Sequence, residues 1–77
     1  MTAREVIELI EARRLLRSGE ARKIRLAAGL SQTEISRSVG VSAGAVSRWE
    51  SGSRRPVGEP AMAYAGLLKS LREAVAS

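Results

Sequence analysis

The segment Leu30–Pro56, LSQTEISRSVGVSAGAVSRWESGSRRP, decides the fold of this chain because it carries successive helix start and stop signals. Ser31 followed three residues later by Glu34 has the pattern of a capping box, in which each residue binds the other's backbone amide. This pattern predicts a helix over about residues 32–39, and Gly40 is placed to end it.

A second short helix is predicted over about residues 43–51, because Ser42 is a favoured N-cap residue and Gly52 follows the last turn. Gly40 permits the positive φ that a tight turn between the two helices requires. If the helices cross steeply there, five apolar side chains point to a common core: Ile35, Val39, Val41, Val46 and Trp49. That is the layout of a helix-turn-helix, whose second helix enters the DNA major groove.

The outward face of the second helix is small or polar, so it can approach a major groove closely. The residues of this face are Ser42, Ala43, Gly44, Ser47 and Arg48. Arg48 is the one long base-capable side chain among them. We hypothesise that Arg48 binds a guanine with its two-pronged guanidinium, that Ala43 contacts a thymine methyl group, and that DNA shape supplies the remaining specificity.

Residues at both ends of this motif are suited to DNA phosphates, which hydroxyls, amides, guanidinium groups and helix N-termini all bind. These residues are Ser31, Gln32, Thr33, Arg54 and Arg55. The chain has 13 Lys+Arg, 8 Asp+Glu and a net charge of +5, of which +4 lies in residues 18–58. A small basic domain attracts polyanions, so we predict that the partner is double-stranded DNA.

Helical patterns flank the motif on both sides, and no stretch alternates apolar and polar residues long enough for a strand. A capping box at Thr2 and Glu5 predicts a helix over about residues 3–17, a second helix follows over about 20–28, and Glu59 opens the last one. The sequence therefore predicts an all-α domain of five helices.

The expected apolar face of the first helix comprises Val6, Leu9, Ile10 and Leu16, widened by Ile7 and Leu15. The second helix is expected to bury Ile24 and Leu26 to Ala28, and the last helix Met62, Ala65, Leu68, Leu71 and Val75. We expect Trp49 in the core, since it lies three residues after Val46, and Tyr64 at an edge of the last helix.

Residue types that are absent or unpaired exclude several classes of function. Without Cys and His, disulfides are impossible, a zinc site is not expected, and the commonest general base is missing. Glu5, Glu8 and Glu11 are spaced three apart and are expected on the outside of the first helix, not as a catalytic pair. We therefore predict no enzyme activity, no metal and no cofactor.

Two further expectations concern the location of the protein and the arginines of the first helix. No apolar run approaches the roughly 18–20 residues of a membrane span, and the start, MTAREVIELI, lacks the pattern of a signal peptide, so we expect a cytoplasmic protein with no membrane partner. Arg13, Arg14 and Arg17 are expected to form a solvated helix end, where cations are favoured. The alternative is that these three arginines extend the DNA surface.

Four stretches together resemble the Cro/C1-type (XRE) helix-turn-helix family: GLSQTEIS at 29–36, VGVS at 39–42, VSRWESG at 46–52 and RRP at 54–56. The resemblance covers about residues 20–70. It implies a compact lambda-repressor-like DNA-binding fold over residues 20–77, with the motif at 32–51. Residues 1–19 would then be an additional N-terminal accessory helix.

The resemblance also implies roles for individual residues. Gln32 is similar to a glutamine that contacts the DNA backbone and braces the recognition helix, and Arg25 and Glu50 match a buried, structural ion pair between two helices. Ser36 departs from the pattern because alanine is usual there, and its hydroxyl can bond back to the preceding turn. Gly44 stands where a long polar base reader is common, so direct base readout by this helix is sparse.

The predicted function is a sequence-specific transcriptional regulator, of the kind found in small phage or prophage repressors, that binds a palindromic operator as a homodimer. The helix at 3–17 or the one at 60–76 would meet a second copy or another protein, and the sequence favours neither. Three alternatives stay open: an antitoxin that also represses its own operon, a protein-interaction module, and an architectural factor that bends DNA.

Overall fold

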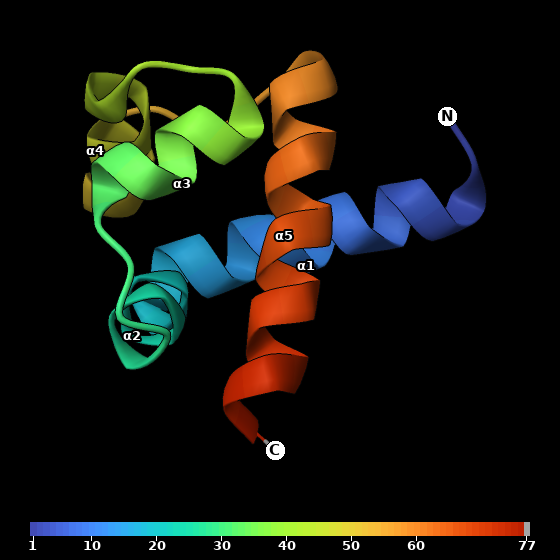
Figure 1. The fold of residues 1–77 in the computed structure, drawn as a ribbon. Coiled ribbons are helices and arrows are strands. Elements are labelled where there is room, and N and C mark those ends of the chain that lie inside the picture. Colours follow the sequence, from blue (N-terminus) through green and yellow to red (C-terminus); the bar gives the residue numbers. More distant parts are fainter. Residues whose placement is uncertain (77) are drawn as a thin grey trace.

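The computed structural model describes residues 1–76, which form the helices α1 (Ala3–Ser18), α2 (Glu20–Ala27), α3 (Gln32–Val39), α4 (Ala43–Ser51) and α5 (Gly58–Ala76). No strand occurs among these residues, and the all-α prediction is confirmed. Figure 1 shows α5 crossing α1 near its middle, with α3 and α4 together on one side of α5.

Local capping sets the starts of α1 and α3 where the sequence predicts them. The hydroxyls of Thr2 and Ser31 accept hydrogen bonds from the amides of Glu5 and Glu34 at 3.2 and 3.0 Å. Both carboxylates reach back to the cap amides at 3.0 and 2.9 Å. Both capping boxes are therefore complete, and they satisfy amides that the first helical turn leaves without partners.

The centre of the core is a contact between α4 and α5. The Trp49 and Tyr64 rings lie 5.1 Å apart at 56°, a tilted geometry that aromatic pairs favour. The expectation that Trp49 is a core residue is confirmed, but the placement of Tyr64 at an edge was wrong, because only 1% of Tyr64 is exposed. Tyr64 belongs to the core cluster, and α5, which carries it, packs against α1, α2 and α3.

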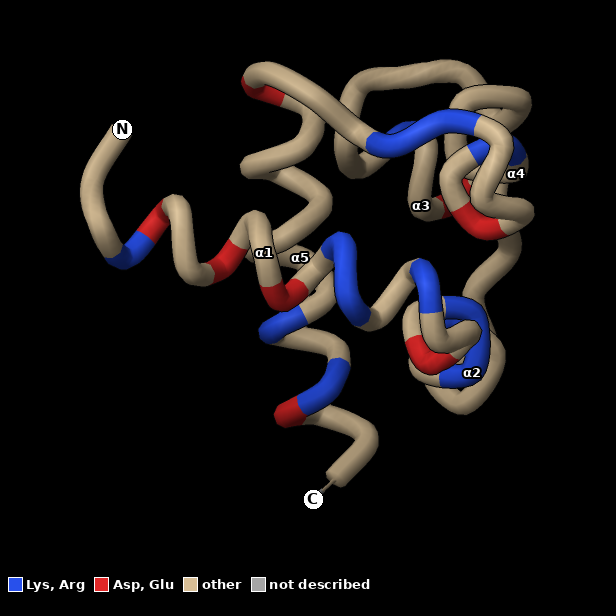
Figure 2. Tube along the Cα trace, turned by 180° about the vertical axis from the view of Figure 1, so that it is seen from behind, with Lys and Arg blue, Asp and Glu red and all other residues tan. Residues whose placement is uncertain are grey.

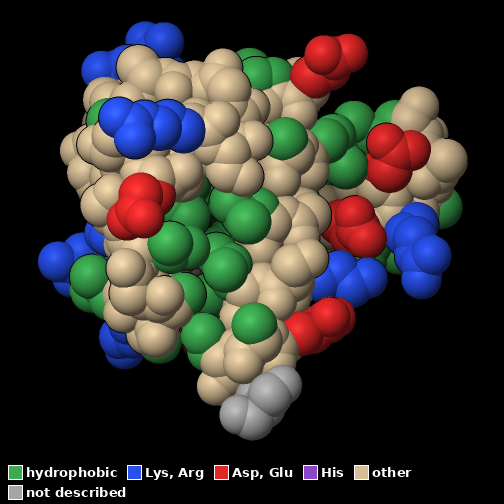
Figure 3. Space-filling model, viewed as in Figure 1, with side chains coloured by type: hydrophobic (Ala, Val, Ile, Leu, Met, Phe, Trp, Pro, Cys, Tyr) green, Lys and Arg blue, Asp and Glu red, His purple; other side chains and the backbone are tan. Residues whose placement is uncertain are grey.

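The first helix belongs to this core only through its C-terminal half, which buries Ala12, Leu15 and Leu16. Val6, Ile7 and Ile10 are 40%, 66% and 59% exposed, so this part of the predicted apolar face is not covered by the chain's own core. The reason is the crossing with α5, beyond which the N-terminal half of α1 projects (Figure 1). Figure 3 shows hydrophobic side chains at the surface of this projecting half.

Two other predicted faces were partly wrong. In α2, Ile24 is buried as expected, but Leu26 and Ala27 are exposed, and the buried neighbours are Ala21 and Arg25. In α5, the buried residues are Ala61, Tyr64, Ala65 and Leu68, while Met62 and Leu71 are half-buried and Val75 is exposed.

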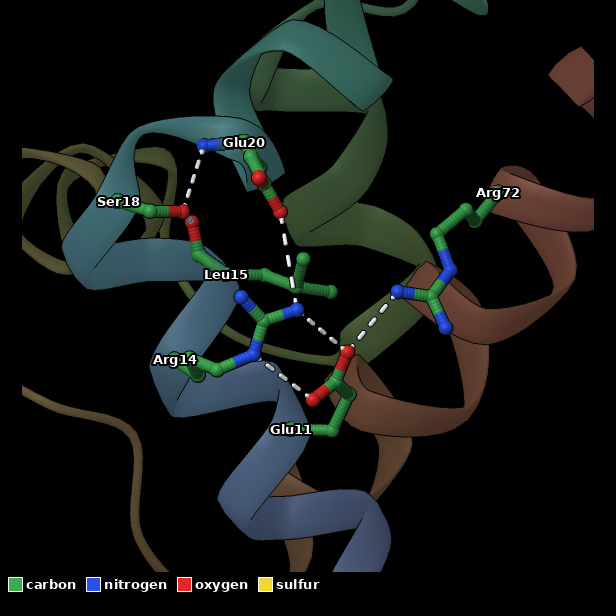
Figure 4. Close-up of polar contacts among 6 residues, drawn as sticks. All are labelled: Glu11, Arg14, Leu15, Ser18, Glu20 and Arg72. Carbon is green, nitrogen blue, oxygen red and sulfur yellow. Dashed lines mark hydrogen bonds and ion pairs between the residues drawn. The ribbon is translucent and has the colours of Figure 1, made fainter.

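Glu8 and Glu11 lie at the surface of α1 as expected, with side chains 26% and 37% exposed, and both also contact α5. Glu8 lies 3.5 Å from Lys69 Nζ, and Glu11 accepts from Arg72 Nη1 at 3.0 Å. Figure 4 shows Glu11 between Arg72 and Arg14, whose Nη2 donates at 2.8 Å. The hydrogen bonds from Arg14 and then Arg72 lower the pKa of Glu11 to about 2.

Candidate nucleic-acid interface

The turn between α3 and α4 has the geometry that a helix-turn-helix needs. Gly40 adopts φ of 85°, and its amide donates to the Ser36 carbonyl at 2.8 Å. The amide of Val41 donates to the same carbonyl at 3.0 Å. An L-residue with a side chain would be strained at this φ, which explains the glycine. The chain therefore reverses tightly, and α3 and α4 pack directly against each other.

Ser36 lies where α3 is closely packed and is only 4% exposed. Its hydroxyl donates to the Thr33 carbonyl at 2.7 Å. The hydroxyl is thus satisfied within its own helix, which is how a polar side chain is tolerated at this buried position.

The outward face of α4 is open to solvent, because Ser42, Gly44, Ser47 and Arg48 are exposed and Ala43 is half-buried. Ser42 is also the N-cap of α4, since its hydroxyl accepts from the Ala45 amide at 3.1 Å. A Cβ placed on Gly44 would lie 3.4 Å from Arg48 Nη1. The guanidinium group of Arg48 therefore lies over the space that Gly44 leaves open.

The inner side of α4 is fastened by a buried ion pair. Arg25 of α2 donates from Nε and Nη2 to the Glu50 carboxylate at 2.7 and 2.9 Å, and from Nη1 to the Leu30 carbonyl at 2.9 Å. The two charged side chains are only 9% and 4% exposed. A two-pronged pair of this kind fixes both distance and orientation, so it holds α4 against α2.

Gln32 joins the same network, because its Nε2 donates to Glu50 Oε1 at 3.0 Å. Burial by itself raises the pKa of Glu50, but the hydrogen bonds from Arg25 and then Gln32 outweigh it, and the pKa lies below its ordinary value. The pKa of Arg25 is raised, mainly by its hydrogen bonds to Glu50. Both groups therefore stay charged at neutral pH, and the start of α3 is tied to the end of α4.

The residues with expected backbone roles lie at two places on the fold. Ser31, Gln32 and Thr33 surround the N-terminus of α3, where Ser31 and Thr33 are exposed and Gln32 is half-buried. Arg54 and Arg55 are exposed on the connection between α4 and α5. The structure thus brings together the residues predicted to face bases at α4 and its N-cap, and places those predicted to contact the DNA backbone at two sites beside it.

A family model described as a helix-turn-helix matches residues 22–73, which is 52 of the 77 residues. The chain belongs to the Cro/C1-type (XRE) helix-turn-helix family. It is accordingly a DNA-binding transcription regulator of the XRE type. Neither a search of curated proteins nor a search of solved structures returned a match. Over residues 1–76, no helix is both long enough and apolar enough to cross a membrane.

One interaction of this XRE regulator was not visible in the sequence. Arg13 of α1 is half-buried, and its Nη2 donates to the Pro56 carbonyl at 3.0 Å. The expectation of a solvated helix end was therefore wrong for Arg13. Pro56 is itself buried and anchors the connection that carries Arg54 and Arg55. No local pattern links residues 43 positions apart, so sequence reasoning had no signal for this contact.

Proposed function

We propose that this XRE regulator is a sequence-specific repressor that binds a palindromic operator as a homodimer, with α4 in the major groove. The observation that carries the proposal is the exposed, small-residue face of α4 on a helix held rigidly by the buried pair of Arg25 and Glu50. A recognition helix must keep its orientation to discriminate bases, and an ion pair buried this deeply supplies that rigidity.

Base recognition in this proposal rests on one long side chain. Arg48 is exposed, charged and able to bind guanine O6 and N7 together. Gly44 and Ala43 present almost no side chain, so α4 can sit deep in the groove, and Ala43 can contact a thymine methyl group. The remaining specificity comes from the shape and deformability of the DNA.

Backbone contacts would position α4 from two sides. The N-terminus of α3, with Ser31, Gln32 and Thr33, offers hydroxyls, an amide and the positive end of a helix dipole to one phosphate. Arg54 and Arg55 would bind phosphates near the other end of α4. Contacts of this type set register and orientation and carry no sequence information themselves.

The proposed homodimer is supported by the exposed apolar side chains on the N-terminal half of α1, namely Val6, Ile7 and Ile10. Contiguous apolar surface of this kind marks protein interaction sites. Two copies would place their α4 helices about 34 Å apart, one turn of DNA, on an inverted repeat. Occupying such an operator in the cytoplasm of a bacterial or phage-infected cell would exclude polymerase from the promoter.

The experiment that tests the proposal is selection of bound sites from a random duplex pool at about 150 mM salt, followed by sequencing. We expect an enriched inverted repeat with half-sites about one turn apart. A single enriched half-site would refute the homodimer but support sequence-specific binding by α4. No enrichment would refute sequence-specific binding.

Two variants of Arg48 test the assignment of the base reader. Arg48→Ala should weaken binding to the selected site by about 1–3 kcal/mol and relax one base position. Arg48→Lys keeps the charge but not the planar fork, so it should also lose the preference for guanine. If Arg48→Lys selects the same site as the wild type, Arg48 contacts only phosphate and its assignment is wrong.

A further inference from the structure

A basic cleft lies between α1 and the connection that follows α4. The cleft has a volume of about 330 Å³ and is lined on one side by Arg13, Leu16 and Arg17 of α1. Its other side is formed by Trp49, the turn at Gly52 and Ser53, and both Arg54 and Arg55. Figure 2 shows the two basic stretches on the same side of the molecule, one on α1 and one on the connection. We call this surface the arginine cleft.

Acidic residues do not neutralise this cleft. None of the eight residues that line it is a carboxylate. Among residues 1–76, Arg17, Arg54 and Arg55 form no ion pair, whereas the neighbouring Arg14 is paired with Glu11. Four guanidinium groups gathered in a concave surface create a positive potential, which attracts an anion.

Arg13 holds one wall of the cleft in place. Its Nη2 is used by the Pro56 carbonyl at 3.0 Å, which holds the side chain in place. Its Nε–H is buried and finds no acceptor among the described residues, the only side-chain donor or acceptor there in this condition. Because this Nε is closed to solvent and Nη2 is engaged by Pro56, Arg13 fixes the loop, and the anion is left to the exposed side chains of Arg17, Arg54 and Arg55.

The position of the cleft relative to α4 indicates which phosphate it meets. Recognition helices place their N-terminal residues against the bases, so the C-terminal end emerges from the groove. The cleft adjoins this C-terminal end, since Trp49, Gly52 and Ser53 line it. With α4 in the groove, the cleft would therefore face the sugar-phosphate backbone beside it.

We propose that the arginine cleft binds a phosphodiester group of the operator backbone, and that α1 thereby extends the DNA contact beyond the family-matched segment. Arg13 and Arg17 both lie before residue 22, where that match begins. Arg17 and the two loop arginines contact the phosphate oxygens, and Arg13 positions the loop through the Pro56 carbonyl. The inference rests on the proposed DNA-binding function and adds a sequence-independent contact to it.

The test compares Arg17→Gln with Arg4→Gln, which makes the same change of charge on the same exposed helix but outside the cleft. Each phosphate contact contributes about −0.9 to the slope of log K against log salt for duplex DNA. Arg17→Gln should therefore flatten the slope by up to about 0.9, so that between 50 and 200 mM salt the wild type loses up to roughly 3.5-fold more affinity than the variant. Arg4→Gln should keep the wild-type slope, and thermal melting of both variants checks that they are folded.

A second measurement locates the contact on the DNA. In the selected operator, single phosphates are replaced in turn by neutral methylphosphonates, and binding is measured for the wild type and for Arg17→Gln. We expect one position beside the half-site at which the wild type loses more affinity than Arg17→Gln does, because Arg54 and Arg55 still face that phosphate in the variant. The inference would be overturned if Arg17→Gln and Arg4→Gln had equal salt slopes, or if the wild type and Arg17→Gln lost the same affinity at every substituted phosphate. Either result would leave the selected site, and hence the repressor proposal, intact. A wild type that binds no DNA would overturn both.

Discussion

Removing one partner of the buried pair between Arg25 and Glu50 should destabilise the whole domain. Arg25→Ala would leave the Glu50 carboxylate, only 4% exposed, with Gln32 as its one remaining donor and would leave the Leu30 carbonyl without a donor. Glu50→Ala would leave the guanidinium group buried with a single carbonyl acceptor. An uncompensated buried charge costs about 3–5 kcal/mol.

The size of that loss can be compared with the total stability. A chain of 77 residues is expected to have a free energy of unfolding of roughly 4–12 kcal/mol. A loss of 3 kcal/mol would lower Tm by roughly 12 °C or more in a domain of this size. The double variant removes both charges together, so it should cost less than the sum of the two single variants, and the difference measures the coupling.

The assay is urea unfolding followed by circular dichroism at pH 7, with Arg14→Ala as the matched control. Arg14 binds Glu11 through Nε and Nη2 at 3.0 and 2.8 Å, the same two-pronged geometry, but its side chain is 49% exposed. Its loss should barely move the urea midpoint, because exposed pairs are solvated. If Arg25→Ala moved the midpoint no further than Arg14→Ala, the argument that burial makes this pair costly to break would be wrong.

Three further outcomes are expected. Gly44→Ala should raise the free energy of unfolding by about 0.5–1 kcal/mol, because glycine is poor in a helix. The same change should weaken operator binding, because the added methyl group would lie on the groove face, 3.4 Å from Arg48 Nη1. If both stability and operator affinity rose, the close approach of Gly44 to the DNA would be contradicted. Ser36→Ala should change stability by less than about 1 kcal/mol in chemical unfolding, since its hydroxyl bonds only within α3; a larger loss would show that the hydroxyl supports the packing. Folding lowers the pKa of Glu50, so the stability that its ionised carboxylate contributes is complete above the ordinary pKa of 4.5 and is lost as pH falls through the lower folded pKa. Glu50→Gln should therefore flatten the decline of Tm in acid, whereas Glu59→Gln at the exposed start of α5 should not.

Sequence reasoning succeeded where the physical cause is local. The capping boxes at Thr2 and Ser31 need only residues three positions apart, and both are present as predicted. The turn at Gly40 likewise depends on the conformation of one residue. The spacing of Val46 and Trp49 defined the inner face of α4 because that helix is short and lies against the core along its length.

Sequence reasoning failed where one helix crosses another. A stripe of apolar residues on α1 shows which side is apolar, but not how much of that side a partner covers. Since α5 crosses at the middle of α1, Leu15 is buried and Ile7 is 66% exposed. The same crossing brings Arg72 to Glu11 and makes an apparent solvent-facing carboxylate into a link between helices.

The sequence by itself determined the five helices, the turn and the outward face of α4, because each follows from backbone hydrogen bonding and periodicity within a few residues. Its resemblance to a family also pointed to the pair of Arg25 and Glu50, which the folded chain contains. Tertiary structure alone decided that Arg13 meets the Pro56 carbonyl and that Arg17 shares a cleft with Arg54 and Arg55. Those residues are about 40 positions apart, and their approach depends on how α1, α4 and α5 pack, which is set by the whole core and by no local pattern.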